Sequence, residues 1–370
     1  MRSFIGNERA IAAVTRGLAS GSPPHAWLFT GPERVGKATL ACILAQALNC
    51  TGSSPDHPTD PVGAQHTANA EQSLEKASAA PGDGWREPCG ECAQCRRIAT
   101  GIHSDVHTVV IELDDDGRQR KGISVDQLRE VERSVALKPY EGRTRVVIVD
   151  PADDMTPEAQ NAFLKTLEEP PPNVVFVLVA TREERLLPTV RSRCRRVEFR
   201  LMAADAIEAA LRETDVEAEQ SRLLARLAGG RVGWALETAG NPALLEKRRE
   251  VLAQARALAA MSLADRFDLA ERLSGQFKND RESVDKRLED WLGWQRDVLL
   301  VQSGAEEGVA NADMLDELQE DARRCDPREV LAFVQGLIAC REHLASNVQS
   351  RIALDALMVE APRAGVRAPA

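Results

Sequence analysis

The sequence predicts an α/β part with a parallel sheet, followed by an all-helical part. The first observation is a set of almost wholly apolar runs, which are residues 26–29, 108–111, 145–150 and 174–180, with a shorter run at 196–199. The second is that helical patterns separate these runs. Strands that are apolar on both faces and joined by helices form parallel sheets covered on both sides. The third is that strand signals stop near Ala203.

The helices expected around the sheet have recognisable ends. They are residues 7–20, the segment that ends near Cys50, and residues 124–137 and 156–169. Ser124 stands at an N-cap position with Gln127 three residues later, which is the pattern of a capping box. The prolines at 170–172 end the last of these helices, because proline cannot continue the backbone hydrogen-bond ladder.

A chain of 370 residues is long for one core, so two or three domains are expected. We assign residues 1–200 to the α/β domain, 201–241 to a small helical domain and 242–361 to a helical bundle, with a tail at 362–370. The bundle helices are expected at 243–260, 262–276, 281–303, 312–324, 327–346 and 349–359. Residues 51–87 are rich in Ser, Pro, Gly, Asp and Ala, which predicts a disordered insertion.

Composition limits the kind of function. The net charge of −10 and the 4% aromatic content argue against a protein that binds nucleic acid along its whole surface. The first six residues lack the apolar core of a signal peptide, and no apolar run approaches the roughly 18 residues of a membrane span. We therefore expect a cytoplasmic protein with no membrane partner.

A glycine-rich loop follows the first strand. Residues 31–39 read G-P-E-R-V-G-K-A-T and lead into an apolar helix. The spacing matches G-x-x-x-x-G-K-[ST], in which Gly31 and Gly36 let backbone N–H groups face phosphates and Lys37 reaches the outer phosphates. The alternative is a loop that has kept its shape only as a tight turn between strand and helix.

Two groups needed for hydrolysis are missing. Ala38 stands where a hydroxyl would bind Mg²⁺, and Thr39 cannot replace it because one helical step rotates a side chain by about 100°. Asp150 follows a buried strand, where a metal-associated carboxylate belongs, but Pro151 occupies the position of the general base. Proline accepts no proton. The sequence therefore predicts that any bound ATP or ADP is not hydrolysed by this chain.

Four cysteines predict a structural zinc site. Cys89, Cys92 and Cys95 are spaced C-x2-C-x2-C, and Cys50 closes the preceding helix. Four thiolates make a closed tetrahedral Zn²⁺ site. The long gap between Cys50 and Cys89 costs little, because doubling a loop adds about 0.6 kcal/mol. His103 or His107 remains an alternative fourth ligand, and free thiols or a redox pair remain the alternative to metal.

Arg193 is a candidate for acting on a neighbouring molecule. It lies in L-L-P-T-V-R-S-R-C at residues 186–194, on a short helix after the strand at 174–180. An arginine fixed there can reach a γ-phosphate in trans. The alternative is an ordinary surface or salt-bridged arginine.

These stretches together resemble the clamp-loader branch of the AAA+ ATPases, found in bacterial DNA polymerase III. The resemblance covers about residues 4–240 well and the final bundle weakly. It rests on I-G-N at 5–7 with H-A-W-L-F-T-G at 25–31, and on the cysteine pattern. It also rests on N-A-F-L-K-T-L-E-E-P-P at 161–171, A-T at 180–181 and S-R-C at 192–194. Thr181 falls at the sensor-1 position of that family.

The family contains ATP-hydrolysing motor subunits, γ/τ, and similar subunits that do not hydrolyse ATP. The motor is expected to carry Thr or Ser at position 38, Glu at 151 and Arg at 233, where this chain has Ala38, Pro151 and Gly233. Arg193 is kept. The resemblance therefore implies a stator in a ring with γ/τ and δ subunits, which loads the β sliding clamp onto primed DNA. Arg193 would complete a neighbouring ATP site, and the small helical domain and the bundle would be the lid and the collar.

Two further readings stay open on the sequence. One is an active clamp-loader ATPase of the γ/τ type, which would turn over Mg-ATP alone in a manner that requires Lys37. The other is a free-standing zinc-dependent protein that binds nucleic acid, which would show salt-sensitive DNA binding.

Overall fold

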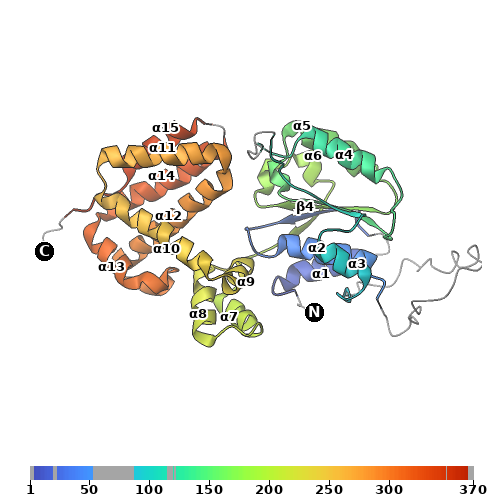
Figure 1. Ribbon diagram of the computed structural model, residues 1–370, viewed down its shortest axis with the longest axis horizontal. Helices are drawn as coiled ribbons and strands as arrows, with labels where there is room; N and C mark the ends of the chain where they lie inside the picture. Colours follow the sequence, from blue (N-terminus) through green and yellow to red (C-terminus); the bar gives the residue numbers. More distant parts are fainter. Residues whose placement is uncertain are drawn as a thin grey trace, which may run out of the picture. The chain divides into compact units, whose positions relative to one another are not determined.

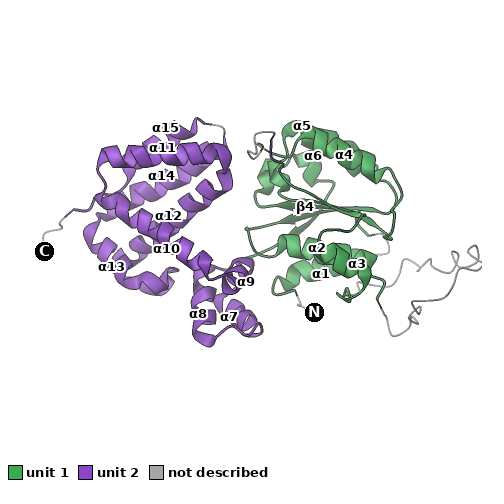
Figure 2. Cartoon of the chain, in the orientation of Figure 1, with its two compact units in different colours: residues 1–112, 120–201 green, residues 113–119, 202–370 purple. Residues whose placement is uncertain are grey.

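The computed structural model describes residues 4–19, 23–52, 87–114, 120, 122–346 and 348–365. These residues form two compact units, one within residues 1–112 and 120–201 and the other within 113–119 and 202–370 (Figure 2). The first unit contains the sheet, and the second is helical (Figure 1). The α/β plus all-α class predicted from the sequence is therefore confirmed. The expected disordered insertion at 51–87 lies almost entirely outside the described residues.

The sheet has five parallel strands in the order β2-β3-β4-β1-β5. Their bounds are β1 Ala26–Thr30, β2 Val106–Val109, β3 Arg145–Val149, β4 Val174–Ala180 and β5 Arg195–Glu198. Every residue of β1, β3 and β4 is buried, which explains their continuous apolar sequence. The carboxyl ends of these strands, where parallel sheets bind ligands, carry the glycine-rich loop and Asp150.

Alternate residues of the central strands divide between two cores. Leu28, Phe176 and Leu178 pack in a cluster that includes residues of α4 (Val125–Val135) and α5 (Pro157–Glu168). Trp27, Phe29 and Val177 pack in a second cluster with residues of α1 (Glu8–Leu18) and α2 (Lys37–Asn49). The sheet is thus covered by helices on both faces, as Figure 1 shows for the first unit.

The helices of the first unit have side-chain caps in some cases and none in others. They are α1 Glu8–Leu18, α2 Lys37–Asn49, α3 Ala93–Ala99, α4 Val125–Val135, α5 Pro157–Glu168 and α6 Pro188–Arg191, with short 3₁₀ turns η1 Ala152–Asp154 and η2 Glu183–Arg185. The capping box of Ser124 and Gln127 is confirmed. Thr156 caps α5 by accepting a hydrogen bond from the N–H of Ala159, with Pro157 in the first turn.

One strand prediction was wrong in position. The run at 108–111 was expected as a strand, but β2 spans Val106–Val109. It is an edge strand whose register is set by pairing with β3, from Val106 opposite Val146 to Val109 opposite Val149. His107 and Thr108 are exposed, so the apolar pattern does not mark its bounds.

The second unit consists of helices in two groups. Three short helices, α7 Ala204–Arg212, α8 Ala218–Leu227 and α9 Val232–Gly240, contact one another. The longer helices are α10 Ala243–Ala257, α11 Leu263–Asn279, α12 Arg281–Gln302, α13 Leu315–Arg324, α14 Pro327–Ala345 and α15 Ser350–Glu360, with 3₁₀ turns η3 Leu258–Ala260, η4 Glu306–Gly308 and η5 Ala312–Met314. The helix expected to end at residue 276 continues to Asn279, and the one expected from 312 begins as η5.

The longer helices share one large core. Its buried residues run from Leu252 to Ala361 and include Trp291, Trp294 and Phe333, all 0% exposed. None of the buried residues of α7, α8 or α9 belongs to this cluster. Among the helices that the structure describes, none combines the length and the apolar character needed to cross a lipid bilayer.

Candidate functional site

The glycine-rich loop joins the carboxyl end of β1 to the start of α2. Gly31 has φ 139° and Gly36 has φ 96°, which is the backbone region that favours glycine. A Cβ on Gly31 would lie 2.3 Å from the carbonyl oxygen of Phe199, so a side chain there would clash with the chain after β5. The loop therefore has the strand, turn and helix context that the sequence predicted for a phosphate cradle.

Lys37 is the buried cation of this loop. It is 6% exposed, and its Nζ donates to the carbonyl oxygens of Gly31 and Pro32 at 2.6 Å each. A longer contact of 3.4 Å reaches the Thr181 hydroxyl. Burial lowers the pKa of Lys37, while the nearby carboxylates of Asp150, Glu33 and Asp153 oppose that effect. The loop thus satisfies the lysine with its own backbone.

Two aspartates lie at the neighbouring strand ends. Burial raises the pKa of Asp150, although the Lys37 ammonium lowers it. Asp153 is 5% exposed and accepts hydrogen bonds from the backbone N–H groups of Thr181 and Arg182 at 3.2 and 3.0 Å. Asp153 therefore ties the turn after β3 to the turn after β4 and leaves Asp150 beside Lys37.

Positions 38 and 151 do not carry the hydroxyl and the acid that a hydrolysing site of this kind is expected to have. Ala38 and Thr39 are both exposed on the first turn of α2, and Pro151 follows Asp150 directly. A methyl group and a pyrrolidine ring offer neither a metal ligand nor a proton acceptor. The strand ends carry the ammonium of Lys37, the carboxylates of Asp150 and Asp153, and the hydroxyl of Thr181.

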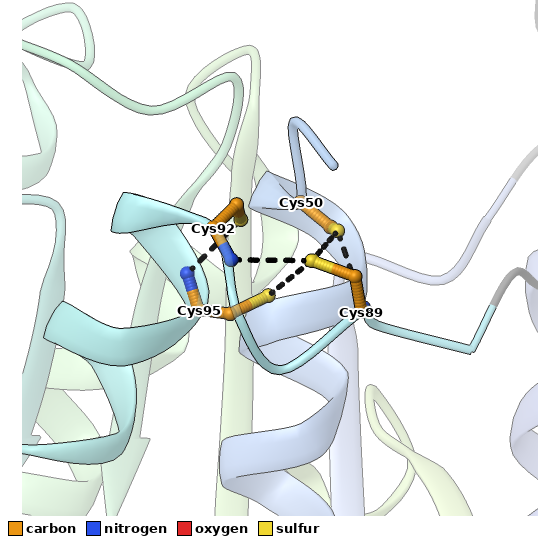
Figure 3. Close-up of side chains that lie close together, drawn as sticks. All are labelled: Cys50, Cys89, Cys92 and Cys95. Carbon is orange, nitrogen blue, oxygen red and sulfur yellow. Dashed lines mark hydrogen bonds between the residues drawn. The ribbon is translucent and has the colours of Figure 1, made fainter. Parts of the chain in front are cut away.

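The four predicted cysteines form one cluster (Figure 3). Their Sγ atoms all lie within 4.8 Å of one another, with 3.5 Å between Cys50 and Cys89 and 4.0 Å between Cys89 and Cys95. A tetrahedral zinc with Zn–S bonds of about 2.3 Å needs sulfur pairs separated by about 3.8 Å. All four are free thiols, because a disulfide would hold two sulfurs at about 2.05 Å.

Backbone N–H groups point at these sulfurs. The N–H of Cys92 donates to Sγ of Cys89 at 3.3 Å, and that of Cys95 to Sγ of Cys92 at 3.4 Å. Burial would raise the pKa of Cys92, but the N–H groups of Cys95 and Thr51 lower it to about 6. These donors stabilise the thiolate of Cys92, the form that binds metal, whereas burial raises the pKa of Cys50 and Cys95. The cluster fits a metal ion in both spacing and chemistry.

The two alternative histidine ligands are not part of the cluster. His103 is buried, and its Nε2 is hydrogen-bonded to Oε1 of Gln94 while its Nδ1 accepts the N–H of Asp105 at 3.0 Å. His107 lies exposed on the edge strand β2. Among the described residues, the group that could hold a metal is therefore the four cysteines.

The cluster is tied to the body of the first unit. Gln46 on α2 donates to the carbonyl oxygen of Cys95 at 2.8 Å, and Asn49 bonds the backbone of residues 143–144 before β3. A Cβ on Gly52 would lie 2.3 Å from Sγ of Cys89, so the chain after Cys50 passes close against the sulfurs. The motif spacing alone does not reveal these supports.

Arg193 follows α6, and an acidic residue of the same chain binds it. Its side chain is 32% exposed. One terminal nitrogen donates to the carbonyl oxygen of Thr189 at 2.7 Å, and the other forms an ion pair with Glu168, the last residue of α5. Ser192 donates from its hydroxyl to the same Thr189 carbonyl, and burial raises the pKa of Cys194 to about 12.

Comparison with known proteins shows which family the chain belongs to. Residues 62–203 match the family described as DNA polymerase III, delta subunit, and residues 242–360 match the family of its C-terminal part. The chain is 28% identical to DNA polymerase III subunit delta′ of Bacillus subtilis over 88% of this chain and 86% of that protein. The chain belongs to the clamp-loader family of DNA polymerase III. It is a homologue of the δ′ subunit.

Other members of the clamp-loader family are also similar to it. The γ subunit of Buchnera aphidicola is 30% identical over 56% of this chain and 46% of its own length. The τ subunit of Escherichia coli is 28% identical over 96% of this chain and 53% of its own length. This chain thus spans about half the length of those two relatives, but most of the length of the δ′ protein.

Solved structures resemble the chain at lower similarity. A DNA polymerase III γ-subunit-related protein from Thermotoga maritima is 19% identical with a TM-score of 0.38, covering 71% of this chain and 86% of that one. The RuvB branch migration motor of the same organism is 14% identical with a TM-score of 0.40, covering 88% of this chain and 92% of that one.

Within this clamp-loader family member, Glu168 is the site residue that the sequence did not suggest. It stands in the run of residues 161–171 that carried the resemblance, yet no spacing rule connects it to Arg193, 25 residues later. Asp153 was likewise missed as the residue that holds the backbone of Thr181. Both act through contacts between segments far apart in the chain.

Proposed function

We propose that this chain is a non-hydrolysing clamp-loader subunit of the δ′ type, which supplies Arg193 to the ATP site of an adjacent γ/τ subunit. The observation that carries the proposal is an asymmetry of groups. Position 38 has no hydroxyl and position 151 no acid, while the guanidinium of Arg193 is partly exposed after α6. A chain with these groups lacks the means to fire its own site but keeps a trans-acting cation.

The partners follow from the same proposal. The chain would assemble with γ/τ and δ subunits, and the ring would place the β sliding clamp on primer-template DNA. Residues 1–200 would form the AAA+ domain, 201–241 the lid and 242–361 the collar that joins the subunits. The first matched family ends at residue 203, the second begins at residue 242, and the longer helices have a core of their own; these observations support this division.

The two cofactor assignments belong to the proposal as well. Cys50, Cys89, Cys92 and Cys95 would hold a structural Zn²⁺, because a closed set of four thiolates leaves no open position for substrate. Gly31, Gly36, Lys37, Ala38, Thr39, Asp150 and Thr181 would form a degenerate nucleotide site. ATP or ADP bound there would remain uncleaved.

The test is reconstitution of the ring from full-length chain, γ/τ and δ, with clamp and primed DNA, followed by ATPase measurement. Arg193→Ala should remove most of the ATPase activity that the chain adds to the mixture, because one trans arginine is worth about 10³ or more in related enzymes. Arg195→Ala is the matched control, since Arg195 is exposed two residues away on β5. An unchanged rate with Arg193→Ala would refute the assignment.

The second candidate function is an active ATPase of the γ/τ type, favoured by the identity of 30% or more to several γ/τ subunits. Purified chain alone with Mg-ATP separates the two. We expect no turnover above background. Turnover that disappears in Lys37→Ala would establish the motor function instead.

A further inference from the structure

We propose that Glu168 is a positioning residue for Arg193, which holds the guanidinium in the orientation that a neighbouring phosphate requires. This inference rests on the proposed trans role of Arg193. Its basis is the ion pair between the Glu168 carboxylate and one terminal nitrogen of Arg193, together with the bond from the other terminal nitrogen to the Thr189 carbonyl.

The two contacts orient the Arg193 side chain and leave some of its N–H donors unbonded. A guanidinium carries five N–H donors in a rigid planar fork. Thr189 and Glu168 each take one donor, and among the described residues no other acceptor bonds this side chain. The Nε–H and one hydrogen on each terminal nitrogen remain for phosphate oxygens. Arg193 can therefore bind a phosphate while Glu168 still holds it.

Glu168 and Arg193 belong to segments that hydrogen bonds connect. Gln160, near the start of α5, accepts the N–H of Leu187 at 2.7 Å and donates to the carbonyl oxygen of Arg185 at 3.3 Å. These bonds connect α5 to the residues that enter α6. Glu168 at the other end of α5 then meets Arg193 just after α6. Helix α5 therefore binds the guanidinium of Arg193 through Glu168, and it binds the residues that enter α6 through Gln160.

The carboxylate of Glu168 contributes little to the stability of the fold. Glu168 is 49% exposed, and ion pairs with that exposure contribute little to folding. A negative charge in the last turn of α5 also opposes the helix dipole, whose C-terminal end prefers cations. The carboxylate is therefore poorly placed for its own helix and well placed for Arg193.

Glu169 supplies a matched control. It is exposed, it is adjacent to Glu168, and no side-chain contact of Glu169 is found among the described residues. Glu168→Gln and Glu169→Gln remove the same charge from the same helix end. Only the first removes the partner of Arg193.

The experiment uses the reconstituted ring and measures kcat and KM for ATP. Glu168→Gln should lower kcat by about 3- to 10-fold with KM unchanged, because it misaligns a group that acts in the transition state. Glu169→Gln should match the unaltered ring. In an Arg193→Ala background, Glu168→Gln should change nothing further, since its effect passes through the arginine.

Each other outcome has a definite meaning. Full kcat in Glu168→Gln, beside a slow Arg193→Ala ring, overturns the positioning role and leaves the trans finger standing. A raised kcat shows that Glu168 restrains Arg193 instead of positioning it. An unaltered Arg193→Ala ring removes both proposals. If Glu168→Gln melts at a lower temperature than Glu169→Gln, Glu168→Asp replaces it and should give an intermediate kcat, and full activity there overturns the inference.

Discussion

Asp105 is a single residue that connects several segments at the amino end of the sheet. It is 0% exposed, and its carboxylate accepts hydrogen bonds from the N–H groups of Tyr140, Glu141 and Gly142 and from the guanidinium of Arg145. Burial alone would raise the pKa of Asp105, but these donors outweigh it and hold the pKa well below its usual range. The charged form is therefore the one that stabilises the fold.

We predict that Asp105→Asn costs about 3–5 kcal/mol of unfolding free energy at pH 7, because Arg145 is left as a buried cation without its partner. The sign with pH follows from the lowered pKa. The stabilisation is complete above the unfolded value of about 4 and declines as pH falls below it. Urea unfolding at pH 7, 4 and 3 measures this.

The control for that comparison is Asp126→Asn, whose side chain is 83% exposed and should change stability by less than about 0.5 kcal/mol. A difference between wild type and Asp105→Asn that stays constant from pH 7 to pH 3 would contradict the assigned role of the charge.

At the scale of an element, α3 depends on the cysteine cluster. The helix has only seven residues, and its N-cap is Cys92, whose sulfur accepts the N–H of Cys95. Isolated helices of this length are unstable in water, so tertiary contacts must maintain it. A metal ion bound by the four sulfurs would supply such contacts at its first turn.

We predict that purified chain carries about one zinc per molecule and that Cys92→Ser reduces this strongly, because a closed thiolate site loses one of its four ligands. Metal analysis of the purified proteins measures the content. Cys42→Ser is the control, since Cys42 lies on α2 outside the cluster. Equal zinc in both variants would argue against the site.

The elements that could be predicted from the sequence are those whose signal is local. The strand β4 is apolar throughout because both faces are buried, and the cap of α4 is written in Ser124 and Gln127. The predicted position of the edge strand β2 was wrong by two residues, because its register is set by pairing with β3 and not by its own apolar pattern. The helix α3 was not predicted, because its N-cap is Cys92, and a cysteine in this spacing indicates a metal ligand instead of a helix cap.

The candidate site follows the same distinction. The glycine loop, Cys89, Cys92 and Cys95, and Arg193 could be found because each lies in a motif of residues close in sequence, and Cys50 was added as the cysteine that closes the preceding helix. The Glu168–Arg193 pair and the bonds from Asp153 to the backbone beyond β4 could not, because tertiary folding creates them. Sequence spacing carries no information about such contacts until the segments are placed.

At the scale of the whole molecule, the two units have separate cores. The clusters on the two faces of the sheet contain residues between Ala10 and Phe199, and the cluster of the long helices contains residues between Leu252 and Ala361. They share no residue. Damage to one core should therefore leave the other unit folded.

We predict that Leu337→Ala, which opens a cavity at a residue 0% exposed in α14, costs the helical unit about 2–5 kcal/mol. Hydrogen exchange should show weaker protection in the long helices and unchanged protection in β1, β3 and β4. The control is Leu331→Ala on the same helix, where the leucine is 48% exposed. Loss of protection in the strands as well would show that the cores are coupled.

The carbonyl contacts of Lys37 make the lysine part of the folded loop. A buried ammonium needs partners that offset its desolvation, and here the peptide oxygens of Gly31 and Pro32 accept its hydrogen bonds while the nearby carboxylates of Asp150, Glu33 and Asp153 favour its charged form. Folding of the loop therefore does not require a bound phosphate. The contacts of Lys37 do not involve the side chains at positions 38 and 151, so the presence of the lysine is no measure of catalytic competence.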